Sequence, residues 1–440
     1  MEADAARSAS SIIQVMSKRA DQRANPAGRG ASSQQARQLT AQSAPLGGGQ
    51  ARAQAASHPT NLLTLRLEAM TYGGDALGRM DGKVIFVRGG IAGEVVRAEI
   101  VEERGHFARA QVVEVVEPSP DRIQPRCSYF GFAANACGGC HWQHIDYSAQ
   151  LRFKAEIVRE QLQRIGRMES GSVRETISSP DVWAYRNHAQ FSVTPEGRLG
   201  FQAARSNRVV PISECHIVQP EIAEWLRGRQ VGSVDKRIEV RADSYGGVGV
   251  WGANFQPPTS TFHILHSTFR VSHDSFFQVN TSLIETLVEL ALRGLSLQGG
   301  ETVLDAYCGV GLFTRFIAPG AQRVIGIESS PSAVADARIN LAEFAHIELH
   351  EGLVEKVLPK IEGAIDAAIV DPPRAGCGPQ VIKALIDKRV KRLVYVSCDP
   401  ATLARDARQL LGSGYSLIEV QPVDLFPHTY HIESVSLFNG

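Results

Sequence analysis

The sequence has no long hydrophobic run and no excess of charge of either sign. Among its 440 residues, no uninterrupted apolar stretch approaches the roughly 18 residues of a membrane span. Lys plus Arg equals Asp plus Glu, at 46 each, which argues against a uniformly basic nucleic-acid binder. Any contact with a polyanion must therefore come from local patches of positive charge.

Cysteine is also sparse. Seven cysteines, an odd number in a large chain, do not suggest a disulfide framework. This usage favours a reducing compartment and thiols that bind a metal or act in catalysis. We therefore expect a cytoplasmic protein.

Residues 1–57 lack Phe, Tyr and Trp and are rich in Ala, Ser, Gln, Gly and Arg. Such a segment buries too little apolar surface to offset the entropy lost on ordering, so we predict a disordered tail. A transit peptide, an upstream start codon and a solvated extension all remain compatible with this composition.

Residues 58–118 have the pattern of a small β-barrel. Apolar and polar residues alternate from Leu63 to Leu67, and the pair Asp81-Gly82 favours a hairpin turn. Several short strands separated by glycine turns are typical of an OB-like barrel.

Cysteines gather in the region 119–261. Cys127, Cys137 and Cys140 have the spacing C-x9-C-x2-C, and Cys215 follows further along. A C-x2-C pair places two thiolates on one turn, which suits zinc or an iron–sulfur cluster, and the residues alone leave both open. Within this region, residues 148–166 predict an amphipathic helix with Ser148 as its N-cap.

Residues 262–440 alternate between strands and helices, which predicts a doubly wound parallel α/β sheet. The expected strands are 302–307, 323–328, 367–371 and 393–397. Gly309 and Gly311 follow the first strand, and Glu328 ends the second. Each has an ordinary alternative, a turn or an exposed acid, but together they favour a nucleotide-like cofactor.

Cys398 follows an apolar run that predicts a buried strand, and Glu433 lies near the C-terminus beside His431. Ligands of open α/β sheets sit beyond the carboxyl ends of the strands. A cysteine nucleophile and a carboxylate base in one crevice suit covalent catalysis on an electrophilic carbon.

From about Leu62 onward, the chain resembles the RNA 5-methyluridine methyltransferases that use S-adenosylmethionine. Eight segments carry the resemblance in family order: GRMDGKVIFVRGGIAGE, CGGCHWQHIDYSAQLRFK, YRNHAQFSV, SFFQVN, LDAYCGVG, DPPRAG, VSCDPATLARD and HIESV. The resemblance implies a Rossmann-like methyltransferase domain, a TRAM barrel that binds RNA and a central β-rich domain with a 4Fe–4S cluster.

The resemblance also implies roles for single residues. Cys398 matches the nucleophile and Glu433 the proton acceptor. The S-adenosylmethionine contacts match Gln278, Tyr307, Glu328 and Asp371, with Gly309 and Gly311 in the glycine turn. The cluster ligands match Cys127, Cys137, Cys140 and Cys215. Two departures are visible: Leu312 replaces an Asn of some members, and the segment between the first two cluster cysteines is longer than usual.

Other expectations concern the partners of these groups. RNA phosphates would meet cations of the barrel, namely Arg79, Lys83, Arg88, Arg104 and Arg109, with Phe86 or Phe107 near bases. Arg405 or His431 would favour the Cys398 thiolate, and Cys308 and Cys377 would be packing cysteines.

We expect a monomer that acts on 23S ribosomal RNA, because relatives with both a TRAM domain and the cluster more often modify that RNA. A tRNA methyltransferase, an amino-methyltransferase and a non-catalytic RNA-binding factor are the alternatives. Intact catalytic and cofactor motifs oppose the last of these.

Overall fold

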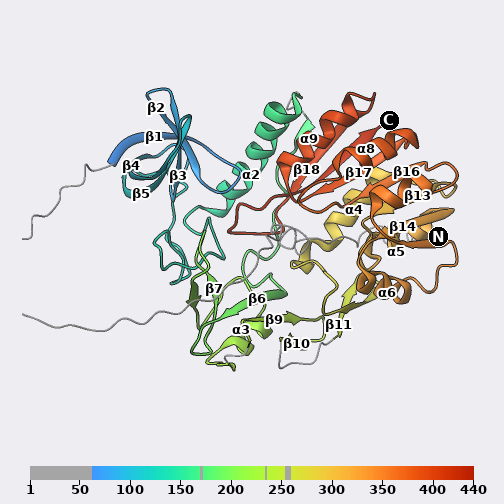
Figure 1. Cartoon of the computed structure of the whole chain (residues 1–440), viewed down its shortest axis with the longest axis horizontal. Coiled ribbons are helices and arrows are strands. Elements are labelled where there is room, and N and C mark those ends of the chain that lie inside the picture. The colour runs from blue at the N-terminus through green and yellow to red at the C-terminus, as the bar shows by residue number, and fades with distance from the viewer. Residues whose placement is uncertain (1–61, 169–171, 233–234, 253–258) are drawn as a thin grey trace, which may run out of the picture.

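The computed structural model describes residues 62–168, 172–232, 235–252 and 259–440. The predicted disordered tail, residues 1–57, lies outside the described residues. Figure 1 shows a β-barrel, a central sheet and a large α/β sheet as separate parts of the molecule. The domain limits proposed above remain predictions.

The N-terminal part forms the closed five-stranded barrel that the alternation predicts, with strand order β1-β2-β3-β5-β4. Its strands are β1 (Leu62–Met70), β2 (Ala76–Met80), β3 (Lys83–Arg88), β4 (Val95–Glu103) and β5 (Phe107–Glu117). Asp81 and Gly82 turn the chain between β2 and β3 with positive φ angles of 50° and 77°, the geometry of a tight hairpin. Alternate residues such as Leu65, Leu67 and Val87 point inward and are buried.

The central sheet has the order β10-β9-β6-β7-β8. Its elements are β6 (His188–Val193), β7 (Leu199–Gln202), β8 (Val209–Pro211), α3 (Pro220–Leu226), β9 (Arg237–Ala242) and β10 (Val248–Trp251). Phe191, Ile238 and Ile222 share one buried core, so α3 packs against this sheet. The segment 127–140, which holds Cys127, Cys137 and Cys140, lies between the barrel and this sheet in the sequence. Cys137 forms a β-bridge with Ala203, which follows β7.

Helix α2 (Tyr147–Gln161) continues into a π-helical turn, η1 (Leu162–Gly166), so the expected helix is present. The prediction that Ser148 is the N-cap of this helix was wrong. The cap is Asp146, which directly precedes the first helical residue, so its carboxylate reaches the free Ser148 backbone N–H. Phe153 and Ile157 of α2 share a buried core with Leu403, which lies in α9 (Pro400–Leu411).

The third part is a seven-stranded sheet with the order β15-β14-β13-β16-β17-β19-β18. Its strands are β13 (Thr302–Ala306), β14 (Arg323–Glu328), β15 (Ile347–Glu351), β16 (Ala367–Val370), β17 (Arg392–Ser397), β18 (Ser416–Val423) and β19 (Glu433–Asn439). The helices are α4 (Ile284–Leu295), α5 (Leu312–Ile317), α6 (Pro331–Asn340), α7 (Val354–Val357), α8 (Gly378–Asp387) and α9, preceded by the hairpin of β11 (Thr259–Ile264) and β12 (Ser267–Ser272).

This sheet is not wholly parallel, which corrects the sequence expectation. β19 is antiparallel to both β17 and β18. The short loop 424–432 between β18 and β19 contains no crossover helix, and strands joined in this way pair antiparallel. The consequence for the site is direct, because β19 then begins where β17 ends.

In the part of the chain that the structure describes, no helix combines the length and apolar character needed to cross a bilayer.

Candidate active site and cysteine cavity

The loop after β17 presents Cys398 at the carboxyl end of the sheet. The Ser397 hydroxyl donates to the Asp399 carbonyl at 2.9 Å and accepts from the Asp399 N–H at 3.1 Å. Asp399 Oδ1 then accepts the N–H groups of Ala401 and Thr402, both at 3.0 Å, and so caps α9. Cys398 is therefore held between two residues that hydrogen bonds restrain.

Two buried carboxyls lie beside this thiol. In the antiparallel register of β17 and β19, Ser397 pairs with Ser434, so Glu433 begins β19 next to Cys398. Burial raises the pKa of Glu433 to about 8. Burial, and then the neighbouring Glu433 carboxylate, hold the pKa of Asp371 well above its usual value. The pKa of Cys398 is also raised well above normal, first by burial and then by Glu433 and Asp371.

Arg374 is the cation of this crevice. Its charge lowers the pKa values of both Cys398 and Glu433 and so opposes the effect of burial. Arg374 Nη2 lies 2.7 Å from His431 Nδ1 and can donate to it. The pKa of His431 is held well below normal by burial and then by Arg374, so this imidazole is neutral.

The predicted contribution of Arg405 or His431 to the Cys398 thiolate stays a prediction, and Arg374 is a further cation at this place. Arg405 donates to Asp406, at 2.8 Å, and to the Ala375 carbonyl, at 2.8 Å, while His431 is uncharged. The residue missed by the sequence analysis, Arg374, lies in the DPPRAG motif quoted above. The basic residue that follows D-P-P was the available signal.

A second group of residues lines the carboxyl ends of β13 and β14. Glu328 Oε2 accepts the Gly309 N–H at 3.2 Å, and Oε1 accepts the N–H groups of Ser329 and Ser330 at 2.7 and 2.6 Å. Gly311 has a φ of 83°, and a Cβ there would lie 2.6 Å from a Leu341 methyl carbon. Glycine is therefore required for this turn.

Two further residues, Gln278 after β12 and Tyr307 after β13, have features that fit contact with a bound polar cofactor. Gln278 is 4% exposed, and its Oε1 makes no hydrogen bond with any described residue. Tyr307 has a φ of 68°, a strained backbone that occurs mostly at functional sites. A ligand that donates to Gln278 would satisfy a group that is otherwise costly to bury.

The buried position of Leu312 accounts for the apolar residue at this place in the family pattern. Leu312 begins α5 and is 1% exposed, inside the core shared with Val310 and Phe313. An apolar side chain therefore packs into the core at this position. Cys308 and Cys377 are also buried, at 5% and 8% exposure.

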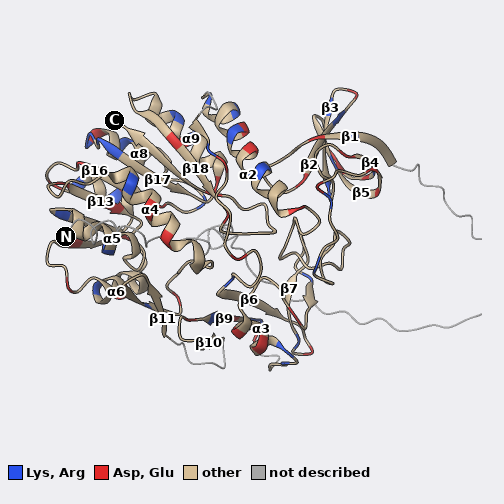
Figure 2. Ribbon diagram, turned by 180° about the vertical axis from the view of Figure 1, so that it is seen from behind, with Lys and Arg blue, Asp and Glu red and all other residues tan. Residues whose placement is uncertain are grey.

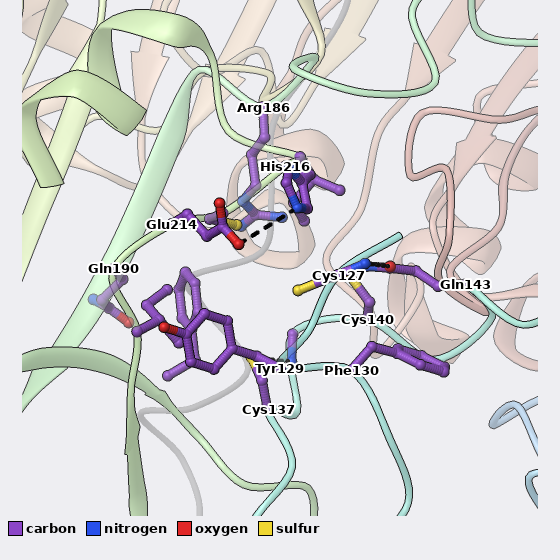
Figure 3. A pocket seen from close by; sticks show the side chains of 15 residues that line it. Cys127, Tyr129, Phe130, Cys137, Cys140, Gln143, Arg186, Gln190, Glu214 and His216 are labelled. Atoms are coloured by element: carbon purple, nitrogen blue, oxygen red, sulfur yellow. Dashed lines mark hydrogen bonds and ion pairs between the residues drawn. The ribbon is translucent and has the colours of Figure 1, made fainter. Parts of the chain in front are cut away.

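The four predicted cluster cysteines line one cavity of about 260 Å³, in which Figure 3 places the labelled Cys127, Cys137 and Cys140. Burial raises the pKa of Cys137 to about 11 and, more strongly, that of Cys140, and the other thiols of the cavity add to both shifts. Among the described residues, no three His, Cys, Asp or Glu side chains converge as ligands of a single metal ion.

The cavity still fits a polynuclear group. Its volume is several times the roughly 30 Å³ that one water occupies in the liquid. Thiolates bind metals, and a cationic metal group would offset the raised thiol pKa values. Cys215, from the loop before α3, completes the four sulfur donors.

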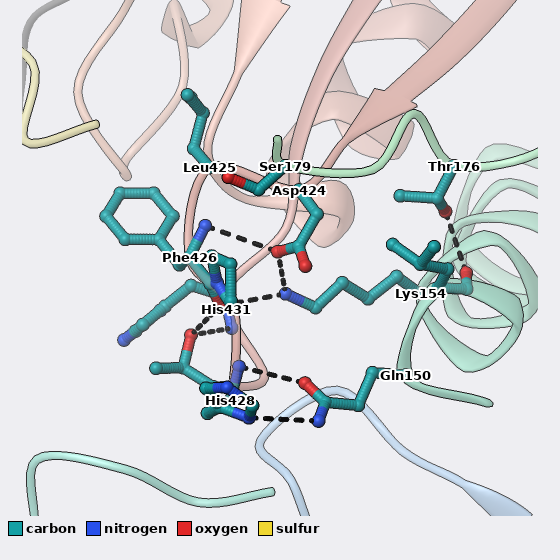
Figure 4. Close-up of polar contacts among 12 residues, drawn as sticks. Gln150, Lys154, Thr176, Ser179, Asp424, Leu425, Phe426, His428 and His431 are labelled. Atoms are coloured by element: carbon teal, nitrogen blue, oxygen red, sulfur yellow. Dashed lines mark hydrogen bonds and ion pairs between the residues drawn. The ribbon is translucent and has the colours of Figure 1, made fainter. Parts of the chain in front are cut away.

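A buried polar network connects helix α2 to the loop 424–432, which precedes Glu433 (Figure 4). Lys154 of α2 forms an ion pair of 2.6 Å with Asp424, and both side chains are fully buried. Gln150 accepts the His428 N–H at 2.8 Å, while the His428 carbonyl accepts the N–H groups of His141 and Trp142 at 2.9 Å. The loop that leads into Glu433 is thus fixed from two sides.

Four of the five barrel cations predicted to bind RNA already have acidic partners. Figure 2 shows acidic and basic positions interspersed on the barrel strands. The ion pairs are Arg79–Glu68, Lys83–Glu103, Arg104–Glu102 and Arg109–Asp75. Arg88 instead lies 5.7 Å from the Phe132 ring centroid. The rings of Phe86 and Phe107 meet edge to face, with centroids 5.9 Å apart.

Comparison with known proteins agrees with this arrangement. A family model described as tRNA (Uracil-5-)-methyltransferase matches residues 263–350 and 361–439, and a TRAM domain model matches 63–113. An uncharacterized RNA methyltransferase of Halalkalibacterium halodurans is 33% identical over 455 residues, covering 87% of this chain and 98% of the relative. Another uncharacterized RNA methyltransferase, from Streptomyces avermitilis, is 34% identical over 418 residues, which cover 84% of this chain and 96% of the relative.

A solved structure is similar across the whole described fold. The tRNA (uracil-54, C5)-methyltransferase of Pyrococcus abyssi, in complex with S-adenosyl-L-homocysteine, matches with a TM-score of 0.64 and 25% identity. The match covers 87% of this chain and all of that one. Together with the sequence relatives, it shows that the chain belongs to the RNA (uracil-5-)-methyltransferase family, whose members transfer a methyl group from S-adenosylmethionine to RNA.

Proposed function

We propose that this enzyme methylates carbon 5 of a specific uridine through a covalent adduct with Cys398, and that its substrate is 23S ribosomal RNA. One observation carries the mechanism. The antiparallel pairing of β17 and β19 brings a thiol, Cys398, and a carboxyl, Glu433, into one buried crevice with Arg374 as their cation.

The reaction needs both groups because carbon 5 of uracil is a poor nucleophile. The Cys398 thiolate adds to carbon 6, which makes carbon 5 enolate-like. S-Adenosylmethionine supplies the electrophilic methyl group that carbon 5 accepts. Glu433 then removes the proton from carbon 5, and the electron pair released expels the Cys398 thiolate from carbon 6.

The cofactor would be held at the carboxyl ends of β13, β14 and β16. We assign its contacts to Gln278, Tyr307, Gly309, Gly311, Glu328 and Asp371. The unsatisfied Gln278 Oε1 and the glycine turn support this assignment. The target uridine has to leave its base stack to reach Cys398 in such a crevice.

The RNA assignment rests on the resemblance, since relatives with both a TRAM barrel and a cysteine cluster more often act on large-subunit ribosomal RNA. The similar structure from Pyrococcus abyssi is a tRNA enzyme, so a tRNA is the second candidate.

Mapping 5-methyluridine in a strain that lacks the gene decides between the two RNAs. We expect one or more 5-methyluridines to disappear from 23S ribosomal RNA and to return when the wild-type gene, but not its Cys398→Ala variant, is restored. Loss confined to tRNA would show that the substrate assignment is wrong while leaving the chemistry intact.

We further propose that Cys127, Cys137, Cys140 and Cys215 hold one 4Fe–4S cluster. Protein purified without oxygen should be brown and contain about four irons per chain, as one cubane on four thiolates requires. Cys140→Ser should lose the colour and the iron, whereas Cys377→Ser, which changes a cysteine outside the cavity, should keep both. Stoichiometric zinc without iron in the wild-type protein would contradict the proposal.

A further inference from the structure

Tyr72, in the turn between β1 and β2, links the barrel to the candidate active site. Its hydroxyl donates to Asp399 Oδ2 at 2.8 Å, across 327 residues of sequence. Asp399 directly follows Cys398, and its other oxygen caps α9. A residue of the N-terminal barrel therefore hydrogen-bonds the carboxylate next to the proposed nucleophile.

The turn that carries Tyr72 is built to hold this position. Thr71 closes the turn by donating its N–H and hydroxyl to the Asp75 carbonyl, at 3.0 and 2.7 Å. Gly74 has a φ of 91°, and a Cβ there would lie 2.9 Å from the Tyr430 ring. The Gly74 carbonyl also accepts from the Trp142 indole at 3.1 Å. The turn is thus locked against the loop that precedes Glu433.

Electrostatics makes the Tyr72 hydrogen bond relevant to the thiol. The Asp399 charge adds to the groups that raise the pKa of Cys398, which also include Glu433 and Asp371. A hydroxyl that donates to a carboxylate stabilises its charge and withdraws part of it. Because little water enters this buried crevice, the charge that remains on the Asp399 carboxylate acts on the Cys398 sulfur with little screening.

Building on the proposed role of Cys398, we infer that Tyr72 is a positioning residue for methyl transfer. Its hydroxyl holds Asp399 in the orientation that caps α9 and presents Cys398, and it reduces the carboxylate charge that opposes thiolate formation. The barrel thereby contributes to the chemistry itself, in addition to any contact it makes with RNA.

The test is the pH dependence of methyl transfer by the full-length Tyr72→Phe enzyme. The assay uses labelled S-adenosylmethionine and total RNA from the strain that lacks the gene. We expect kcat to fall about tenfold near neutral pH, with the alkaline rise of the profile moved upward by about one pH unit. The KM for S-adenosylmethionine should change little.

Tyr415→Phe is the matched control. Tyr415 is buried and donates its hydroxyl to the Val390 carbonyl at 2.7 Å, beyond the carboxyl end of α9. Loss of this hydroxyl should lower the melting temperature without moving the pH profile. If Tyr72→Phe behaves in the same way, Tyr72 has only a structural role and the inference is overturned.

A double-mutant cycle with Asp399→Asn tests the route of the effect. The amide can still cap α9 but carries no charge, so the pH profile of this variant should move downward. Tyr72→Phe should then cost less than about threefold in the Asp399→Asn background. A tenfold cost in both backgrounds would show that Tyr72 does not act through the Asp399 charge.

These outcomes are separate from those of the proposed function. If Cys398 forms the covalent adduct but the Tyr72→Phe profile matches the wild type, only the present inference fails. If Cys398→Ala still forms the adduct, the proposed mechanism fails first.

Discussion

Replacing Cys398 by Ala is expected to abolish methyl transfer and the covalent complex with RNA. Without the thiolate, carbon 5 of uracil is not activated, so turnover should fall by roughly 10³-fold or more. The sharpest readout uses RNA that contains 5-fluorouridine, since fluorine cannot leave as a proton does. Wild-type enzyme should then form a band that resists denaturation and requires S-adenosylmethionine.

Two variants control this experiment. Cys377→Ala removes another buried thiol of the same domain and should still form the band. Cys398→Ser keeps the size of the side chain, so a normal melting temperature with no adduct would separate lost chemistry from lost folding. An adduct that persists in Cys398→Ala would identify a different nucleophile and reject the central proposal.

Replacing Glu433 by Gln is expected to block the reaction at a later step. The amide cannot take the proton from carbon 5, so turnover should fall about 10²- to 10³-fold, a typical effect of losing a general base. Addition of Cys398 and methylation still occur, and a methylated RNA that is covalently bound should accumulate on natural uridine. Glu348→Gln, at an exposed acid paired with Arg323, should turn over normally without trapped RNA.

The pH dependence of the wild-type enzyme follows from the same residue. The pKa of Glu433 is raised to about 8, and only its ionised form can act as a base. Proton removal and the release of methylated RNA that follows it should therefore become faster as pH increases through about 8, because the protonated acid below that pH cannot act as the base. Release of RNA that is insensitive to pH between 6 and 9, or an absence of trapped RNA in Glu433→Gln, would assign the base to another group.

The local structure of the chain was largely predictable. Alternation from Leu63 to Leu67 and the Asp81-Gly82 turn identified the barrel, because side-chain period and turn geometry are short-range properties. The strands that precede Cys398 and Glu328 were equally visible as apolar runs. The error at Ser148 was also local, since Asp146 competes for the same free amides of α2.

Electrostatic partners were harder to predict than the motifs themselves. The barrel cations looked available to RNA, yet Arg79 of β2 pairs with Glu68 of β1, and Lys83 of β3 pairs with Glu103 of β4. Arg405 was expected near Cys398, but its guanidinium donates to the adjacent Asp406, and Arg374 is the cation that lowers the pKa of Cys398. Charge pairing depends on the distances between charged side chains in the folded protein, and the linear sequence does not contain those distances.

The sequence by itself determined which groups are available for chemistry: a thiol and a carboxyl at named positions, a glycine turn after a buried strand and four cysteines at short spacing. Residue type and short spacing are sufficient for those conclusions. Only the tertiary structure decided how the groups meet. The antiparallel insertion of β19 places Glu433 beside Cys398, and docking of the barrel brings Tyr72 to Asp399. Both contacts depend on strand pairing and packing between distant segments, which arise only when the whole chain folds.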